Sequence, residues 1–182
     1  MSYFNIVSQS DESTVVAEYT PQSQRSEAYQ SEADLENEFI RLLCELGYER
    51  LAIHKEADLI ANLRTQLEKL NDYRFTDGEW QRFWNEVLAN SNSGILEKTR
   101  LIQEDYVQVL RRDSGESKNI QLIDKKCIHH NSLQVIHQYA ISAKEGAAHD
   151  NRYDVTVLVN GLPLVHIELK RRGVPIREAF NQ

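Results

Sequence analysis

The stretch that most constrains the fold of this chain is Arg152–Arg171, which reads RYDVTVLVNGLPLVHIELKR. Two apolar runs, Val155–Val159 and Leu162–Leu169, flank the dipeptide Asn160-Gly161. Asn-Gly favours the two positive-φ positions of a type I′ turn, so the pattern predicts an antiparallel hairpin. Because both runs are almost wholly apolar, we expect this hairpin to be buried.

Three charged residues interrupt the hairpin: Asp154, Glu168 and Lys170. Glu168 and Lys170 are two residues apart, so their side chains leave the same face of a strand. If Val159 faces Leu162 across the turn, Asp154 lies near Glu168 on the ladder, within the slack of one β-bulge. A buried carboxylate needs a counter-charge, and two carboxylates beside one ammonium group suit a divalent cation with a preference for oxygen, such as Mg²⁺.

These residues also carry a family resemblance. Asp154 followed by Glu168-Leu169-Lys170 resembles the D…ExK signature of the PD-(D/E)xK nuclease superfamily. The strings NGLPLV (160–165) and IELK (167–170) are similar, more narrowly, to the N-terminal nuclease domain of the R (restriction and motor) subunit of type I restriction–modification enzymes. The resemblance implies an α/β (α+β) fold, with a mixed central sheet of about five strands flanked by helices.

The resemblance further implies a Mg²⁺-dependent endonuclease that hydrolyses DNA phosphodiester bonds in the restriction of foreign DNA. Asp154 and Glu168 would bind Mg²⁺ together with a backbone carbonyl next to Glu168, and Lys170 would position or activate the water. The implied partners are double-stranded DNA and the modification and specificity subunits. The 182 residues contain no Gly-x-x-x-x-Gly-Lys-[Ser/Thr] loop, so ATP binding and translocation are expected only in a C-terminal motor part.

Further site residues are candidates by the same resemblance. Glu38 is the expected acidic residue on the helix before the sheet; its alternative is a solvated helix-flank glutamate. Gln138 matches a glutamine on the strand before the hairpin, although it also fits an ordinary half-exposed position. Arg171 and Arg172 form a basic pair that could contact phosphate. Gln182 would begin a Gln-x-x-x-Tyr motif whose tyrosine falls beyond the sequence, which suggests a fragment of a longer protein.

The domain organisation follows from composition and periodicity. Residues 1–30, rich in Ser, Gln and Glu, are expected to be a flexible tail, with a possible short strand at Tyr3–Val7. Residues 31–182 are expected to be the nuclease domain. Helical periodicity predicts helices at Ser31–Leu46, Glu56–Asn71, Asp77–Ala89 and Ile95–Ile102, and period two predicts strands at Tyr106–Arg111, Asn119–Ile123 and Ser132–Ser142.

Two of the predicted helices carry informative patterns. Ser31 with Asp34, and Thr76 with Glu79, approximate capping boxes. The first helix has an apolar stripe that we expect to face the core, formed by Leu35, Phe39, Leu42, Leu43 and Leu46. The third has an aromatic face, formed by Trp80, Phe83, Trp84, Val87 and Leu88. Such a face could stack nucleic-acid bases, but the interpretation as core is favoured.

Other residues and the composition add limits. Cys127, His129 and His130 invite a zinc interpretation, but no partnering pair stands out and a plain loop is favoured. His149 could be a general base, although an exposed loop histidine is favoured. The two cysteines have no paired spacing, which suggests a reducing cytoplasm. The sequence has no run of 18 apolar residues, so it does not support a membrane span. The net charge of −7 argues against a dedicated DNA-coating module but not against a nuclease.

Two alternatives to the nuclease stay open at this point. The first is a catalytically silent nuclease fold that serves as a DNA- or protein-binding module. The second is a structural domain in which Asp154, Glu168 and Lys170 form only a buried ion triad, which apolar substitutions would tolerate.

Overall fold

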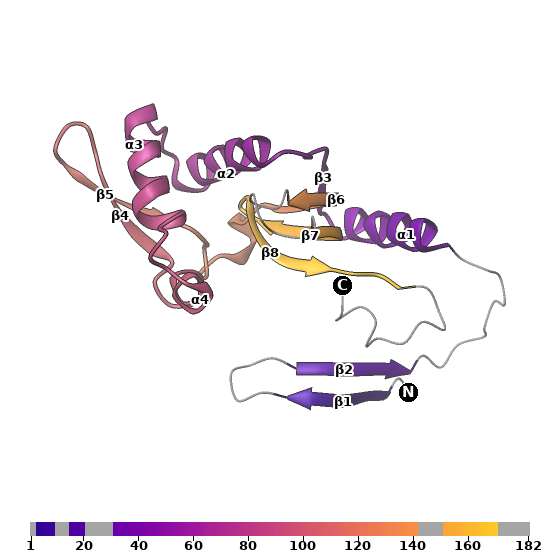
Figure 1. Cartoon of the computed structure of the whole chain (residues 1–182). Coiled ribbons are helices and arrows are strands. Elements are labelled where there is room, and N and C mark those ends of the chain that lie inside the picture. The colour runs from indigo at the N-terminus through magenta and orange to yellow at the C-terminus, as the bar shows by residue number, and fades with distance from the viewer. Residues whose placement is uncertain (1–2, 10–14, 21–30, 142–150, 171–182) are drawn as a thin grey trace. The chain divides into compact units, whose positions relative to one another are not determined.

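The computed structural model of the chain describes residues 3–9, 15–20, 31–141 and 151–170. The chain divides into two compact units, Met1–Gln30 and Ser31–Gln182. In the first unit, β1 (Tyr3–Gln9) pairs antiparallel with β2 (Val15–Thr20) (Figure 1). The strand expected at the N-terminus therefore lies within β1, and the flexibility of residues 1–30 stays a prediction.

The second unit mixes helices and strands. Its elements are α1 (Glu32–Glu45), β3 (Glu49–Leu51), α2 (Glu56–Asn71), α3 (Asp77–Phe83), the π-helical turn η1 (Trp84–Leu88), α4 (Ile95–Gln103), β4 (Val107–Arg111), β5 (Ser117–Gln121), the 3₁₀ turn η2 (Ile128–His130), β6 (Leu133–Ile141), β7 (Asn151–Val159) and β8 (Leu162–Ile167). Within the described ranges, no helix is long and apolar enough to cross a bilayer.

The described strands of the second unit form a mixed sheet of order β3-β6-β7-β8 and a separate pair β4–β5. β3 runs parallel to β6, and the other neighbours are antiparallel. The α+β class predicted from the sequence is confirmed. The central sheet has four described strands rather than about five, because β4 and β5 pair with each other and not with it.

The predicted helix starts are also confirmed. At the start of α1, the Ser31 hydroxyl accepts from the Asp34 amide, and the Asp34 carboxylate accepts from the Ser31 amide. Thr76 and Glu79 form the same reciprocal pair at the start of α3. Each box satisfies amide groups that the first helical turn leaves without intrahelical partners.

The two faces of the central sheet are covered by different helices. Val135 and Ile136 are consecutive in β6 and point to opposite faces. Val135 packs with Ile40 of α1, whereas Ile136 belongs to a cluster that Leu59 of α2 covers. The sheet is therefore enclosed between α1 and α2 at its centre.

The face that α1 turns toward the sheet differs from the predicted one. Its buried residues are Glu36 and Ile40. Leu42 and Leu46 are 44% and 75% exposed, so the prediction was wrong for these two, although Phe39 and Leu43 do pack against the core. At 100° per residue, the buried face lies about a quarter turn from the centre of the predicted stripe.

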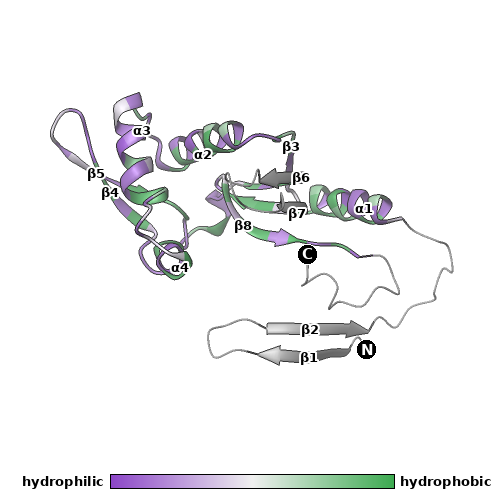
Figure 2. Cartoon of the chain, in the orientation of Figure 1, coloured by the Kyte–Doolittle hydropathy of each residue, from purple (hydrophilic) through white to green (hydrophobic). Residues whose placement is uncertain are grey.

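A second core joins α2, α3 and the β4–β5 pair to the hairpin. It contains Leu63, Leu67, Phe75, Trp80, Phe83, Leu110, Ile120, Leu122 and Leu162. The core interpretation of the aromatic face is thus confirmed for Trp80 and Phe83, which are buried. Figure 2 shows hydrophobic and hydrophilic colour alternating around α2 and α3, as expected for helices with one buried face.

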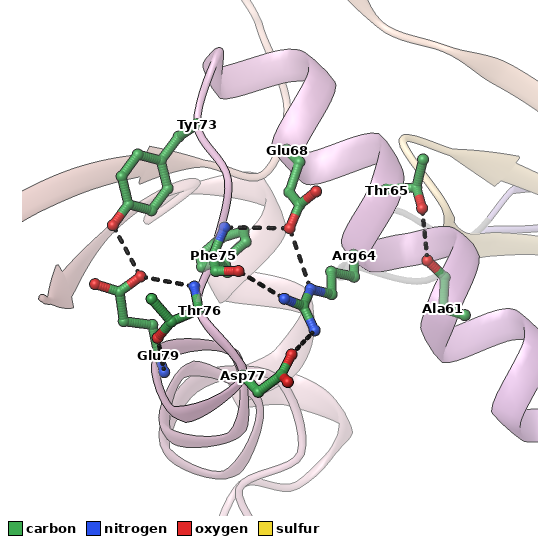
Figure 3. A network of polar contacts seen from close by, with 9 residues as sticks. All are labelled: Ala61, Arg64, Thr65, Glu68, Tyr73, Phe75, Thr76, Asp77 and Glu79. Atoms are coloured by element: carbon green, nitrogen blue, oxygen red, sulfur yellow. Dashed lines mark hydrogen bonds and ion pairs between the residues drawn. The ribbon is translucent and has the colours of Figure 1, made fainter. Parts of the chain in front are cut away.

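Polar contacts fix the loop between α2 and α3 (Figure 3). Arg64 Nη2 donates to the Phe75 carbonyl at 2.6 Å, and Glu68 Oε1 accepts from the Phe75 amide at 3.1 Å. On the other side of the loop, Tyr73 donates its hydroxyl proton to Glu79 Oε2 at 2.9 Å. These bonds satisfy the loop backbone and hold the aromatic core in one arrangement.

The turn of the β7–β8 hairpin has the predicted chemistry. Asn160 and Gly161 both have positive φ, 51° and 80°, as a type I′ turn requires. The buried Asn160 side chain accepts from the Ser132 amide and donates to the Leu122 carbonyl. A Cβ atom at Gly161 would lie 2.6 Å from Leu63 Cα, so α2 rests directly on the turn.

The contact between α2 and the turn gives a stability prediction with a matched control. Gly115 has φ +87° but nothing within 4 Å of its Cβ position. Gly115→Ala should therefore cost only the backbone strain, about 1–2 kcal/mol. Gly161→Ala adds overlap with the backbone of α2 and should cost about 3 kcal/mol or more. Urea unfolding measures both; equal losses at the two positions would show that α2 does not constrain the turn.

Candidate active site

The pairing register of the hairpin determines which side chains meet. Val159 faces Leu162 and Leu158 faces Pro163, but beyond a one-residue shift Val157 faces Val165. Leu164 is thus the extra residue of a β-bulge. After the shift the ladder runs to Val155 opposite Ile167, so the next position along it sets Asp154 against Glu168. Without the bulge, Asp154 would lie opposite Ile167.

The catalytic candidates lie together, as the sequence predicted. Asp154 Oδ2 accepts a hydrogen bond of 2.7 Å from the amide of Leu169, the residue between Glu168 and Lys170. Lys170 Nζ forms an ion pair of 2.6 Å with Glu168 Oε1, and both side chains are partly buried. The carboxylate of β7 is therefore tied to the backbone that carries the other two groups.

The electrostatics of the cluster are unbalanced. Partial burial raises the pKa of Asp154, and the negative charges of Glu168 and Glu36 raise it further, against the opposing effects of the Leu169 amide and Lys170. The hydrogen bond to Glu168 raises the pKa of Lys170, so its ammonium group stays charged at neutral pH. Among the described residues, the negative charges of Glu168 and Glu36 thus act on Asp154, and the charge of Lys170 opposes them.

The helix carboxylate at this point is Glu36, which the sequence analysis missed. The residue is 6% exposed, and its Oε2 atom lies 2.6 Å from His137 Nε2 and accepts from Gln138 Nε2 at 3.1 Å. Glu38, the expected residue, instead lies on the exposed side of α1 in an ion pair with Arg41. The structure does not bring Glu38 to the site.

Gln138, the candidate on the strand before the hairpin, lies beside Asp154 and has an unusual backbone conformation. His137 faces Val155 and Tyr139 faces Tyr153, so Gln138 lies opposite Asp154 in the ladder. Its φ is +53°, a left-handed conformation that costs a residue with a Cβ atom on the order of 1–2 kcal/mol. This strain lies within the candidate site rather than at a turn.

The structure does not describe every predicted site residue. Arg171, Arg172 and Gln182, like His149, lie outside the described residues. Of the residues that the structure does describe, no three His, Cys, Asp or Glu side chains are arranged to hold a metal ion together. That finding extends to the segment Cys127–His130, where His130 Nδ1 contacts Asp124 Oδ2 at 2.9 Å.

Both the burial of Glu36 and the position of the β-bulge had signals in the sequence. Glu36 shares a helical face with Ile40 and Leu43, at spacings of four and seven residues, and an acidic residue on a buried face is informative. Pro163 lacks an amide donor and is tolerated in strands mainly at edges and bulges. The left-handed conformation of Gln138 had no such signal, because glutamine does not favour it.

Comparisons with known proteins agree with the resemblance in the hairpin. The family described as "Type I restriction enzyme R protein N terminus" matches residues 29–182. The chain is 45% identical over 177 residues to the type I restriction enzyme EcoprrI endonuclease subunit of Escherichia coli, covering 97% of this chain and 55% of that protein. It is 42% identical over 160 residues to the SauMSSORF170P endonuclease subunit of Staphylococcus aureus (strain MSSA476), covering 85% and 16%.

The chain matches a different fraction of the length of each relative. The chain spans about half the length of the Escherichia coli protein and about one sixth of the Staphylococcus aureus protein. Within this chain, however, the family match takes in all of the second structural unit, including the hairpin and its charged cluster. The chain therefore belongs to the type I restriction enzyme R protein family, of which it matches the N-terminal region.

Proposed function

We propose that this chain is the endonuclease part of a type I restriction enzyme R subunit and hydrolyses DNA phosphodiester bonds with the help of Mg²⁺. The observation that carries the proposal is the joining of Asp154 to the backbone of the Glu168-Leu169-Lys170 segment. This contact unites the two halves of the D…ExK signature in one site. Membership of a restriction-enzyme family supports the same activity.

The donor set fits a magnesium ion. Mg²⁺ keeps several waters and is usually held by only one or two carboxylates, so a set of three protein side chains is not required. Hydrogen bonds engage Asp154 Oδ2 and Glu168 Oε1, and among the described contacts the second oxygen of each carboxylate has no hydrogen bond. These two oxygens and a backbone carbonyl next to Glu168 would hold the ion.

The charge of the cluster fits a cation as well. Asp154, Glu168 and Glu36 together outnumber Lys170, and the pKa of Asp154 is raised by its partial burial and by the other two carboxylates. A divalent cation would remove this repulsion. When bound, it would supply Lewis-acid stabilisation to the oxygens of the phosphate whose phosphorus atom is attacked.

The residues of the chain have distinct roles in the proposed reaction. Lys170, held by Glu168, positions the attacking water. It also offsets the negative charge that develops on the phosphate oxygens in the five-coordinate transition state. The Leu169 amide fixes the Asp154 carboxylate so that its other oxygen keeps one orientation. Glu36 adds negative charge from α1, and Arg171 and Arg172 are proposed to contact the neighbouring phosphates.

We also propose where the enzyme acts and with which partners. The subunit would act in the cytoplasm on double-stranded foreign DNA, assembled with modification and specificity subunits. ATP-driven translocation would be supplied by motor domains that these 182 residues do not contain. Cleavage assays therefore use the R subunit that carries this domain, assembled with its partners.

Substitution of the site carboxylates and the lysine tests the proposed hydrolysis. Asp154→Asn, Glu168→Gln and Lys170→Met should each lower the DNA cleavage rate of the assembled enzyme on the order of 10³-fold or more, because each removes a charge on which the reaction depends. Cleavage of supercoiled plasmid in the presence of Mg²⁺ measures the effect. Glu36→Gln should also reduce the rate, whereas Glu38→Gln should not.

The outcome of this assay separates the proposal from its alternatives. A wild-type rate in the Asp154, Glu168 or Lys170 variant would exclude the assigned roles. A domain that binds DNA without cutting it would leave all variants and the wild type equally inactive. Equal losses in Glu36→Gln and Glu38→Gln would contradict the choice of Glu36 over Glu38.

The crowding of carboxylates gives a prediction about stability and pH. Asp154 has a higher pKa in the folded chain than in the unfolded chain, so its ionisation destabilises the fold above the unfolded pKa of about 3.9. Asp154→Asn keeps an acceptor for the Leu169 amide and removes the charge. Without divalent cations, it should raise the Tm at pH 7 by on the order of 2–4 °C, and the gain should vanish as the pH falls toward 4.

Thermal unfolding followed by circular dichroism at several pH values checks this expectation. Asp77→Asn is the matched control, because Asp77 is an exposed partner of Arg64 and its loss should change the Tm by no more than about 1 °C. A lower Tm for Asp154→Asn at pH 7 would mean that Asp154 is stabilised rather than strained in its ionised form.

A further inference from the structure

His137 contacts the candidate site but has no role in the proposed hydrolysis. It lies on β6, where it faces Val155, the neighbour of Asp154. Its Nε2 atom lies 2.6 Å from Glu36 Oε2. With its proton on Nε2, the imidazole donates to this carboxylate oxygen. A short hydrogen bond to a buried carboxylate is among the stronger hydrogen bonds in proteins.

The two hydrogen bonds to Glu36 fall on the same oxygen atom. Gln138 Nε2 also donates to Oε2, at 3.1 Å, while Oε1 accepts no hydrogen bond among the described residues. A buried carboxylate without donors would be costly, so these contacts make the position of Glu36 tolerable. Among the described residues, two donors thus hold one oxygen of Glu36 and none holds the other.

The backbone of β6 is distorted in a way that creates this arrangement. Consecutive residues of a regular strand point to opposite faces, so His137 and Gln138 would not reach the same atom. The left-handed conformation of Gln138, with φ +53°, breaks the alternation. The strain opposite Asp154 therefore has an identifiable result, which is the double contact with Glu36 Oε2.

We propose that His137 is a positioning residue that holds Glu36 Oε2, so that the negative charge of Glu36 stays beside the divalent cation that Asp154 and Glu168 would bind. The inference rests on the proposed function, since it assumes a cation beside Asp154 and Glu168. A glutamate side chain has three rotatable bonds, and the imidazole fixes its end against rotation. His137 itself touches neither the cation nor the DNA.

Loss of the donor should weaken cation binding more than it changes the fold. Removal of a hydrogen-bonding partner outside the direct ligands of a metal typically lowers metal affinity about 10–100-fold. His137→Phe keeps a planar ring and removes the donor, so we expect a Kd for Mn²⁺ at least about 10-fold higher than that of the wild type. His137→Gln retains an amide donor and should recover most of the affinity.

Isothermal calorimetry of the full 182-residue chain with Mn²⁺ is the experiment, with Tm measured in parallel without metal. His130→Phe is the matched control, because it removes a histidine–aspartate contact of 2.9 Å from the segment before β6, and should leave the Mn²⁺ affinity unchanged. In a Glu36→Gln background, His137→Phe should have no further effect on the affinity, since His137 acts through Glu36. His137→Ala repeats the test if the phenyl ring prevents folding.

The outcomes separate this inference from the proposed function. If the wild type binds Mn²⁺ and Asp154→Asn does not, the metal site stands. An unchanged affinity in His137→Phe, with or without a lower Tm, would then overturn the role of His137 alone, because a merely structural histidine changes only the Tm. If the wild type binds no Mn²⁺, or binds it as Asp154→Asn does, both the metal site and the role of His137 are refuted.

Discussion

The register of β7 against β8 is the constraint on which the candidate site depends. A strand alternates its side chains between two faces, so a shift of one residue changes which groups share a face. The extra residue at Leu164 turns Asp154 toward the charged end of the next strand instead of toward an apolar residue. Asn160 and Gly161 fix one end of the pairing, and the Leu169 amide bound to Asp154 fixes the other.

The two ends of the hairpin differ in how well their polar groups are satisfied. At the turn, the buried Asn160 has partners for both its oxygen and its nitrogen, and α2 packs on the backbone. At the other end, Asp154 has a raised pKa, Glu36 is buried and Gln138 is strained. Unfavourable features confined to one end are typical of a functional site held by a stable scaffold.

Much of the hairpin could be predicted from its residues, because the determinants are local. Asn-Gly specifies the turn, apolar runs specify the strands, and the positions of Asp154, Glu168 and Lys170 relative to the turn bring them together. The choice between Glu36 and Glu38 was not local. It depends on which side of α1 meets the sheet, and the leucine stripe indicated a different side from the one that Ile40 and Glu36 occupy. The conformation of Gln138 likewise follows from tertiary contacts.

Contacts between distant residues also decide which strands belong to the central sheet. The predicted strands near residues 106–123 do form, but as their own pair, because strand propensity does not specify the partner of a strand. Family membership supplied the context that single residues could not, and the structure supplied the arrangement of α1, β6 and the hairpin around one cluster of charge.

If Asp154 and Glu168 bind one divalent cation between them, anomalous X-ray diffraction from crystals of the chain soaked in Mn²⁺ should reveal it. We expect a single strong anomalous peak within coordination distance of both carboxylates, with Glu36 beside it. A well-ordered site with no peak, or with a peak that contacts neither Asp154 nor Glu168, would contradict it.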